Sequence, residues 1–256
     1  MHESTATDSP TVSSATDGRS YTSPIESLRG VARFHEETAL KHFFAALPLP
    51  DDHAFLDVGC GYGRKMQWMR DLGINPTGVD INPAHIQAVR DAGMEALSID
   101  EFDSSDKLYD GMLMSHIIEH SRPEDLMGFI DKYLDRLKDD GYLVIATPMP
   151  WVGFLEDFDH VRPYPPRSIT QVFATSTTQV QYHGRSRLKL IDLALRRVPY
   201  SPQYTDLMYS KMHQGGLLWK LRYYRLPRIY RKVFKISGGS LGGCTTGWIG
   251  VSQKKA

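Results

Sequence analysis

A short run of glycines after an apolar segment constrains this chain more than any other feature. Residues 54–63 read Ala-Phe-Leu-Asp-Val-Gly-Cys-Gly-Tyr-Gly, which predicts a buried strand followed at once by Gly59, Gly61 and Gly63. Glycines at this spacing let the chain turn sharply into a helix, and they let a ligand lie against bare backbone beside the N–H groups of the helix start. The segment therefore predicts an α/β protein with a ligand site at this turn.

The spacing of the glycines does not fit the usual dinucleotide motif, Gly-x-Gly-x-x-Gly. The third glycine comes one residue early, and Arg64 stands where it would be expected. Residues 76–80 predict a second strand that ends in Asp80, 21 positions after Gly59. A carboxylate at that position can accept hydrogen bonds from both hydroxyls of a ribose. The alternative is a glycine turn of another α/β protein, in which Asp80 is only a turn or capping residue.

These residues resemble the first motif of the class I S-adenosylmethionine-dependent methyltransferases: an acidic residue, one spacer and Gly-x-Gly-x-Gly. The resemblance implies a Rossmann-like, seven-stranded, mostly parallel sheet with helices on both faces and an antiparallel last strand. It implies S-adenosylmethionine as the cofactor, with the glycine loop under its methionine part and the adenine amine near Asp100. The implied cofactor-binding residues are Asp57, Gly59, Cys60, Gly61, Gly63, Asp80, Ile81, Asp100 and Ser115.

The rest of the pattern alternates strands with helices, which favours right-handed crossovers and a parallel sheet covered on both faces. Apolar spacing predicts helices at 26–47, 65–72, 83–89 and 122–138, the last opened by a capping box of Ser121 and Glu124. Further strands are predicted at 94–99, 109–114, 142–147, 187–197 and 245–251.

The chain is long enough, at 256 residues with 41% hydrophobic content, for one large α/β domain with an insertion. We expect a disordered tail at 1–24, rich in Ser, Thr, Asp and Pro, and a single domain at 25–256. The two cysteines, Cys60 and Cys244, form no disulfide framework or metal pattern, and no export signal or apolar span is present. A cytoplasmic protein is predicted.

Residues 199–243 are too long to be a hairpin loop and are read as an insertion between the last two strands. The net charge of the whole chain is zero, but residues 183–256 carry 15 Lys and Arg against two Asp. The basic, aromatic stretch 219–235 suggests a lid or docking helix for an anionic, lipid-linked or sugar-phosphate acceptor, with peripheral membrane contact as one form of it. A solvated cap over the sheet edge is the alternative. Overall neutrality argues against a nucleic-acid partner.

Residues 116–120 read His-Ile-Ile-Glu-His, which matches a zinc motif of some metalloproteases. We reject that interpretation because the segment falls at the end of a predicted strand and not inside a helix. It is similar instead to the Glu-x-x-Glu-His of ubiquinone-pathway O-methyltransferases and small-RNA 2′-O-methyltransferases, which holds a divalent metal, with His116 replacing the first glutamate. His160 could complete the set. The histidine argues against magnesium, which prefers oxygen ligands, whereas a His-rich site would suit zinc or manganese. Because many related methyltransferases keep Glu-His here without a metal, we assign no metal and keep a divalent ion as the less favoured alternative.

The resemblance extends over residues 50–150 and weakens in the region that would choose the acceptor. We predict an S-adenosylmethionine-dependent methyltransferase acting on a hydroxyl oxygen of a small-molecule, glycan or lipid-linked acceptor. The predicted catalytic residues are His116, Glu119, His120 and His160, among which a histidine would act as the base or serve only a structural role. An N-methyltransferase and a non-catalytic binding module with the cofactor fold are the alternatives, although the Asn-Pro-Pro-Tyr type motif of amino-group methylating relatives is absent.

Overall fold

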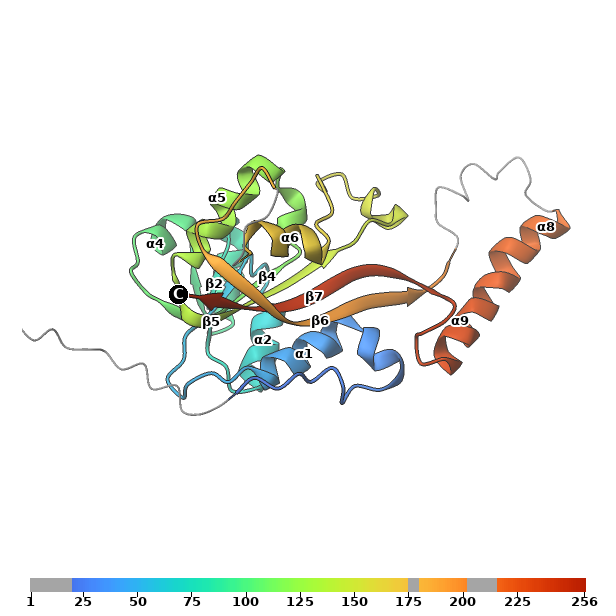
Figure 1. Ribbon diagram of the computed structural model, residues 1–256, viewed down its shortest axis with the longest axis horizontal. Coiled ribbons are helices and arrows are strands. Elements are labelled where there is room, and N and C mark those ends of the chain that lie inside the picture. The colour runs from blue at the N-terminus through green and yellow to red at the C-terminus, as the bar shows by residue number, and fades with distance from the viewer. Residues whose placement is uncertain (1–19, 175–179, 202–215) are drawn as a thin grey trace, which may run out of the picture.

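The protein is described by a computed structural model that covers residues 20–174, 180–201 and 216–256 (Figure 1). Its centre is one seven-stranded sheet in the order β3-β2-β1-β4-β5-β7-β6. The strands are β1 (Phe55–Val58), β2 (Pro76–Val79), β3 (Glu95–Leu97), β4 (Tyr109–Ser115), β5 (Leu137–Pro148), β6 (Arg187–Pro199) and β7 (Gly243–Lys255). The first five are parallel, and β7 runs antiparallel to both of its neighbours, β5 and β6. This confirms the predicted fold class.

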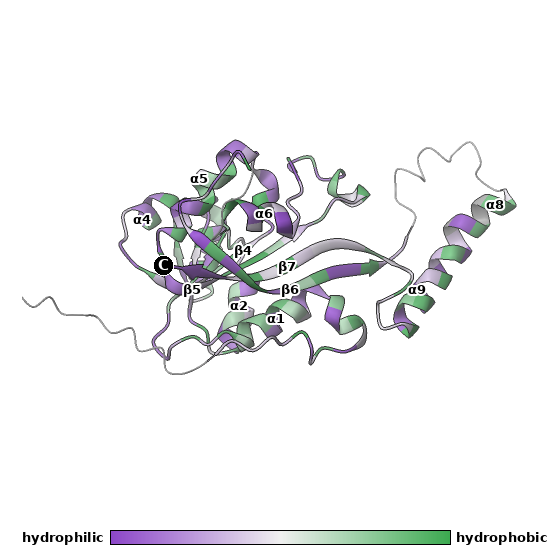
Figure 2. Cartoon of the chain, in the orientation of Figure 1, coloured by the Kyte–Doolittle hydropathy of each residue, from purple (hydrophilic) through white to green (hydrophobic). Residues whose placement is uncertain are grey.

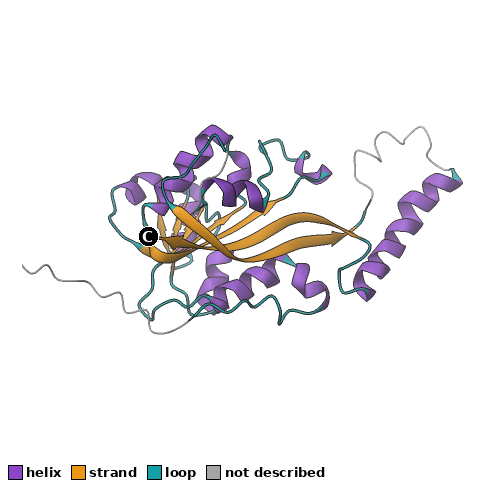
Figure 3. Ribbon diagram, in the orientation of Figure 1, coloured by secondary structure: helices purple, strands orange, loops and turns teal. Residues whose placement is uncertain are grey.

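Helices cover both faces of the sheet, as the secondary-structure colouring in Figure 3 shows. In chain order they begin with η1 (Gly30–Phe34), α1 (Glu36–Ala46), α2 (Arg64–Asp71), α3 (Pro83–Asp91), α4 (Ile99–Asp103) and η2 (Ile118–His120). They continue with α5 (Pro123–Leu134), η3 (Val152–Phe154), α6 (Pro166–Val172), α8 (Leu217–Lys220), the π-helical segment η5 (Leu221–Arg225) and α9 (Leu226–Ile236). Among the described residues, no helix is both long and apolar enough to cross a membrane.

Alternating side chains of the central strands feed two separate cores. Leu113 of β4 packs with Phe43 of α1 and Met69 of α2 on one face of the sheet. Met112 of β4 packs with Ile130 of α5 on the other face. Because successive side chains of a strand point to opposite faces, the sheet packs against α1 and α2 on one side and against α5 and α6 on the other (Figure 1). This rigid sandwich fixes the edge at which β1, β2 and β4 end.

Several predicted boundaries change in the structure. The helix expected at 26–47 divides into η1 and α1 at His35, whose backbone is extended. The strand expected at 94–99 ends at Leu97, and Ile99 already belongs to α4. The capping box expected at Ser121 and Glu124 does not form, because α5 starts at Pro123 and its N-cap is Arg122. Proline favours the first helical position, which moves the cap one residue beyond Ser121.

The predicted N-terminal tail is only partly described. Of the tail predicted at 1–24, residues 1–19 lie outside the described residues. The part that is described is packed in place: the hydroxyl of Tyr21 donates to Asp192 Oδ2 at 2.9 Å. Tyr21 also lies against the ring of Tyr142. The side chain of Tyr21 thus packs on the sheet.

Candidate functional site

The glycine loop forms the turn that the sequence predicts. Gly59, Gly61 and Gly63 all have positive φ angles, and Gly63 is the N-cap of α2. The Gly59 N–H donates to Val79 O of β2 at 2.7 Å, so the loop is anchored to the neighbouring strand. A Cβ atom on Gly59 would overlap the Ile117 side chain, whereas a Cβ on Gly61 would meet no atom within 4 Å. The backbone at Gly61 thus faces open space in which a ligand can lie.

Asp80 ties the loop to the end of β2. Its Oδ2 accepts from the Gly61 N–H at 2.9 Å, and its Oδ1 accepts from the Asn82 N–H at 2.8 Å. His85 Nδ1 lies 3.2 Å from the same Oδ1. A carboxylate has about four lone-pair sites, so these three contacts leave about one for a ribose hydroxyl of the predicted ligand.

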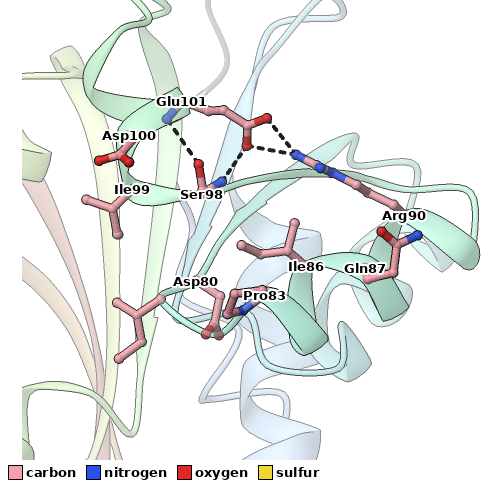
Figure 4. A pocket seen from close by; sticks show the side chains of 10 residues that line it. Asp80, Pro83, Ile86, Gln87, Arg90, Ser98, Ile99, Asp100 and Glu101 are labelled. Carbon is pink, nitrogen blue, oxygen red and sulfur yellow. Dashed lines mark hydrogen bonds and ion pairs between the residues drawn. The ribbon is translucent and has the colours of Figure 1, made fainter.

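A cavity of about 530 Å³ opens beside Asp80, between α3 and α4 (Figure 4). Ile99 and Asp100 lie on one side of it and Asp80 with Pro83 on the other. Ile81, which is 85% exposed, also lines it. Apolar side chains with a few carboxylates at the end of adjacent strands suit a planar, polar-edged ring.

Asp100 does not directly follow a strand, as the strand predicted at 94–99 would have it. It stands in the first turn of α4, after Ser98, whose hydroxyl accepts from the Glu101 N–H in a capping box. Glu101 in turn pairs with Arg90 at 2.8 Å (Figure 4). Asp100 still lines the cavity, because the strand ends at Leu97 and the short helix carries the carboxylate to the same edge.

Two buried polar atoms at the centre of this edge have no hydrogen-bond partner among the described residues: Asp57 Oδ2 of β1 and Ser115 Oγ of β4. Burial raises the pKa of Asp57 to about 7, with Lys65 opposing and Asp80 adding to the shift. A buried carboxylate oxygen left without a partner is costly and suggests a ligand that donates to it. Together with the open backbone at Gly61, these atoms fit the amino and hydroxyl groups of the implied cofactor.

His116, at the end of β4, lies between two carboxylates, one of which also pairs with an arginine. Its Nδ1 lies 3.1 Å from Glu119 Oε1, and its Nε2 lies 3.0 Å from Glu36 Oε1 of α1. Arg196 of β6 donates to Glu36 Oε2 at 2.7 Å. Burial opposes the charged form of His116, but the hydrogen bonds and charges of the two carboxylates outweigh it and raise its pKa to about 9. His116 also has a φ of 58°, an uncommon conformation for a residue with a side chain.

The four predicted catalytic residues lie together, but they are held differently. Glu119 is fully buried, and its Oε2 accepts from the Thr147 hydroxyl at 2.9 Å. His120 Nδ1 lies 3.0 Å from Asp159 O, and His160 Nδ1 lies 3.0 Å from Phe154 O. The two imidazole rings are 5.0 Å apart. Each backbone carbonyl requires an Nδ1–H donor, which leaves Nε2 of a neutral His120 ring as an acceptor nitrogen. His160 Nε2 instead lies 3.5 Å from the Asp157 carboxylate.

Ligand atoms of Glu119, His120 and His160 lie within 4.8 Å of one another, so this trio is geometrically able to hold a metal ion. Both oxygens of Glu119 already accept hydrogen bonds, from His116 and Thr147. The ring of His160 is also stacked on Phe154 at 4.6 Å. These contacts hold Glu119 and His160 in place without a metal ion, so the trio could also serve only to shape the pocket. The segment is a turn and a short 3-10 helix, which agrees with rejecting the zinc-helix interpretation.

The loop after β5 closes this side of the site. The N–H groups of Val161 and Arg162 both point to Glu119 O, at 2.9 and 3.2 Å. The Tyr164 hydroxyl donates to Ser121 O at 2.8 Å. These bonds fasten residues 159–164 onto η2.

Comparison with known proteins identifies the family. A model described as a methyltransferase domain matches residues 32–180, more than half of the chain. The chain belongs to this methyltransferase family. The predicted class of enzyme is confirmed, and S-adenosylmethionine is the cofactor that the family implies and that the site fits.

Individual relatives match the methyltransferase less completely. A ubiquinone biosynthesis O-methyltransferase from Chelativorans sp. (strain BNC1) is 33% identical over 101 residues, which are 36% of this chain and 39% of that protein. The chain thus spans about two fifths of the length of the curated relative it matches.

Solved structures share the fold. A SAM dependent methyltransferase from Archaeoglobus fulgidus is 21% identical with a TM-score of 0.50, covering 78% of this chain and 86% of that one. The cyclase SpnF is 17% identical with a TM-score of 0.51, covering 91% of this chain and 92% of that one. At these identities the likeness concerns the fold, which serves more than one reaction.

Sequence reasoning missed Glu36, Arg196 and His85. Glu36 opens α1 and contacts His116 only because that helix packs on the sheet beside β4. Arg196 reaches the same carboxylate from β6. His85 had the clearest signal, because it stands five residues after Asp80 in the first turn of the helix that Pro83 opens.

Proposed function

We propose that this methyltransferase transfers the methyl group of S-adenosylmethionine to a hydroxyl oxygen of a small-molecule, glycan or lipid-linked acceptor. The observation that carries the proposal is the contact between His120 Nδ1 and the Asp159 carbonyl. Nδ1 is fixed by this carbonyl, 3.0 Å away, so that Nε2 is the acceptor nitrogen. A hydroxyl group needs a base to remove its proton when it attacks a methyl group, and an imidazole nitrogen with a free lone pair can accept that proton.

When bound, S-adenosylmethionine supplies an activated methyl group on a sulfonium. Asp57, Gly61 and Asp80 would hold the cofactor, with Ile81 and Asp100 beside its adenine ring and Ser115 near its methionine part. The loop after β5 would exclude water and set the acceptor oxygen in line, since the transfer depends on alignment. His120 Nε2 would then take the hydroxyl proton.

The other predicted catalytic residues receive positioning roles. His116 keeps its proton at neutral pH, because its pKa is raised to about 9 and both of its nitrogens face carboxylates. It is therefore suited to hold Glu119 in place and not to act as the base. Glu119 supports the η2 turn through Thr147, and His160 supports the position of His120 through ring contact. A divalent ion at Glu119, His120 and His160 is the alternative role of this trio.

The proposal can be tested in two steps. Calorimetric titration with S-adenosylmethionine and S-adenosylhomocysteine, using NAD as a control, measures cofactor binding. Transfer of a labelled methyl group to matched hydroxyl and amine acceptors, repeated with EDTA, measures the reaction. Binding of both ligands and labelling of hydroxyl acceptors alone would support O-methyl transfer. Labelling of amines alone would replace it with the N-methyltransferase, and absence of cofactor binding would favour a binding module. Loss of labelling with EDTA would assign the metal.

A further inference from the structure

The segment 217–236, here called the arm, has many exposed residues. It consists of α8, η5 and α9, and it projects from the sheet in Figures 1 and 3. The α9 end is anchored: Phe234 is buried, and Tyr230 packs edge-on against Tyr200 at 5.1 Å. α9 contacts β6, β7 and η1, whereas α8 and η5 contact chiefly each other and α9. The anchored face thus leaves the other faces of the arm to solvent.

Exposed aliphatic side chains occur at both ends of the arm. Leu217 and Leu218, at its start, are 83% and 81% exposed. Ile229, Val233 and Ile236 follow one another along α9 at spacings of four and three residues, which places these three on one side of that helix. Ile236 is 87% exposed. Aliphatic side chains gathered in this way at the surface indicate a binding surface rather than a solvated cap.

A second exposed side of α9, beside the first, is basic. Arg228, Arg231, Lys232 and Lys235 are exposed and recur at helical spacing on α9. The whole arm has seven Lys and Arg and contains no Asp or Glu. Figure 2 shows the resulting mixture of hydrophilic and hydrophobic residues along α9. The partner of this surface must therefore be anionic and must also accept aliphatic side chains.

We propose that the arm is an interfacial helix that docks the protein on an anionic lipid surface. Apolar side chains flanked by Lys and Arg are the pattern by which a helix lies in the headgroup region of a bilayer and attracts acidic lipids. A nucleic acid would use the basic side chains and aromatic stacking, but it gives the exposed leucines and isoleucines no contact. Charge complementarity and aliphatic exposure together favour lipid.

The position of the arm relates this surface to the candidate site. β5 ends at Pro148, which pairs with Gly247 of β7. The β6–β7 hairpin continues beyond that pair to Pro199 and Gly243, and the arm is attached there. This is the edge at which the parallel strands end and the site lies. The docking itself is independent of methyl transfer; only its consequence, an acceptor carried at the lipid surface, rests on the proposed function.

The test is co-sedimentation of the full chain with vesicles of phosphatidylcholine, with and without phosphatidylglycerol. We expect binding to the acidic vesicles alone. The triple variant R228S/R231S/K235S should weaken it on the order of 100-fold, because each basic residue near a charged bilayer contributes about fivefold. The variant L218S/I229S/I236S keeps every charge and should also weaken it, since the aliphatic contacts are lost. Circular dichroism checks that both variants are folded.

The matched control is R70S/R167S/K189S, which removes three exposed charges of the same sign outside the arm. It should bind acidic vesicles like the unaltered protein. Equal loss in the control and the arm variant, or no vesicle binding by the unaltered protein, would overturn the proposal. Binding to single-stranded RNA in place of vesicles would overturn it in favour of a nucleic-acid partner. Calorimetry with S-adenosylmethionine on the same samples separates this outcome from failure of the proposed function.

Discussion

Glu36 Oε1 lies 3.0 Å from His116 Nε2, although the two residues are 80 positions apart. The contact joins the first residue of α1 to the turn that follows β4. Arg196 extends it to β6 through the other Glu36 oxygen, at 2.7 Å. A line of alternating charges therefore runs across the site edge from Arg196 to the buried Glu119. This line fastens the N-terminal helix over the ends of the central strands.

The line of charges predicts a pH-dependent stability. The folded pKa of His116 is about 9, above its ordinary value of 6.5, so its contribution is fully present below pH 6.5 and is lost as the pH rises through 9. Burial alone would raise the pKa of Glu36, but His116, then Arg196 and Lys65, lower it to about 2. The Glu36 contribution is therefore present above pH 4.5 and is lost as the pH falls through 2.

His116→Gln should lower the free energy of unfolding at pH 6 by about 3 kcal/mol, because it leaves the buried Glu119 without its cation. For a chain of this size that is roughly 6–12 °C in melting temperature. The difference between the two proteins should shrink as the pH rises from 6.5 to 9, which melting curves measured across this range would show. A difference that stays constant with pH would mean that His116 is not charged in the folded protein.

Asp80→Ala should weaken S-adenosylmethionine binding by about 1–3 kcal/mol, through lost charge-assisted hydrogen bonds. Part of the loss would come from the glycine loop, because Asp80 also holds the Gly61 and Asn82 N–H groups. Calorimetric titration gives the affinity. Asp91→Ala is the matched control, since it removes the same charge from an exposed position on α3. If both variants bind like the unaltered protein, Asp80 has no part in the site.

Gly61→Ala and Gly93→Ala form a pair that separates backbone strain from ligand contact. Both glycines have positive φ, and a Cβ on either would meet no atom within 4 Å. Each substitution should therefore cost about 1–2 kcal/mol of stability, the price of a left-handed conformation. Only Gly61→Ala should also reduce cofactor affinity, by roughly tenfold or more, because the alanine methyl group would occupy space that we expect the cofactor to fill.

Melting curves and titration on the Gly61 and Gly93 variants are the measurements. Equal cofactor affinity for both variants would remove the loop backbone from the site.

The local parts of this site were predictable, and the long-range parts were not. The turn from β1 into α2 follows from Gly59, Gly61 and Gly63, since positive φ at three nearby positions is a property of the residues themselves. Glu36 carried no such signal, because its role depends on how α1 packs against the sheet. Apolar spacing located that helix, yet it did not reveal the break at His35 that sets where Glu36 begins it.

Two Ser-x-x-Glu sequences in this chain show that a neighbouring residue can determine whether a capping box forms. Both Ser98 with Glu101 and Ser121 with Glu124 have the spacing of a capping box. Only the first forms. The second is displaced by Pro123, whose fixed φ suits the first helical position. Weighing the proline first would have corrected the start of α5. The role of Asp100 in α4 also depended on recognising Ser98 as a cap.

The last prediction concerns the base. His120→Gln should lower the rate of methyl transfer by about 10²–10⁴-fold, because the acceptor hydroxyl would lose the group that takes its proton. Cofactor affinity should not change, since His120 lies on η2 and outside the cavity beside Asp80. His183→Gln, an exposed histidine between α6 and β6, is the control. A His120 variant that keeps the rate of the unaltered enzyme would assign the proton transfer to another group.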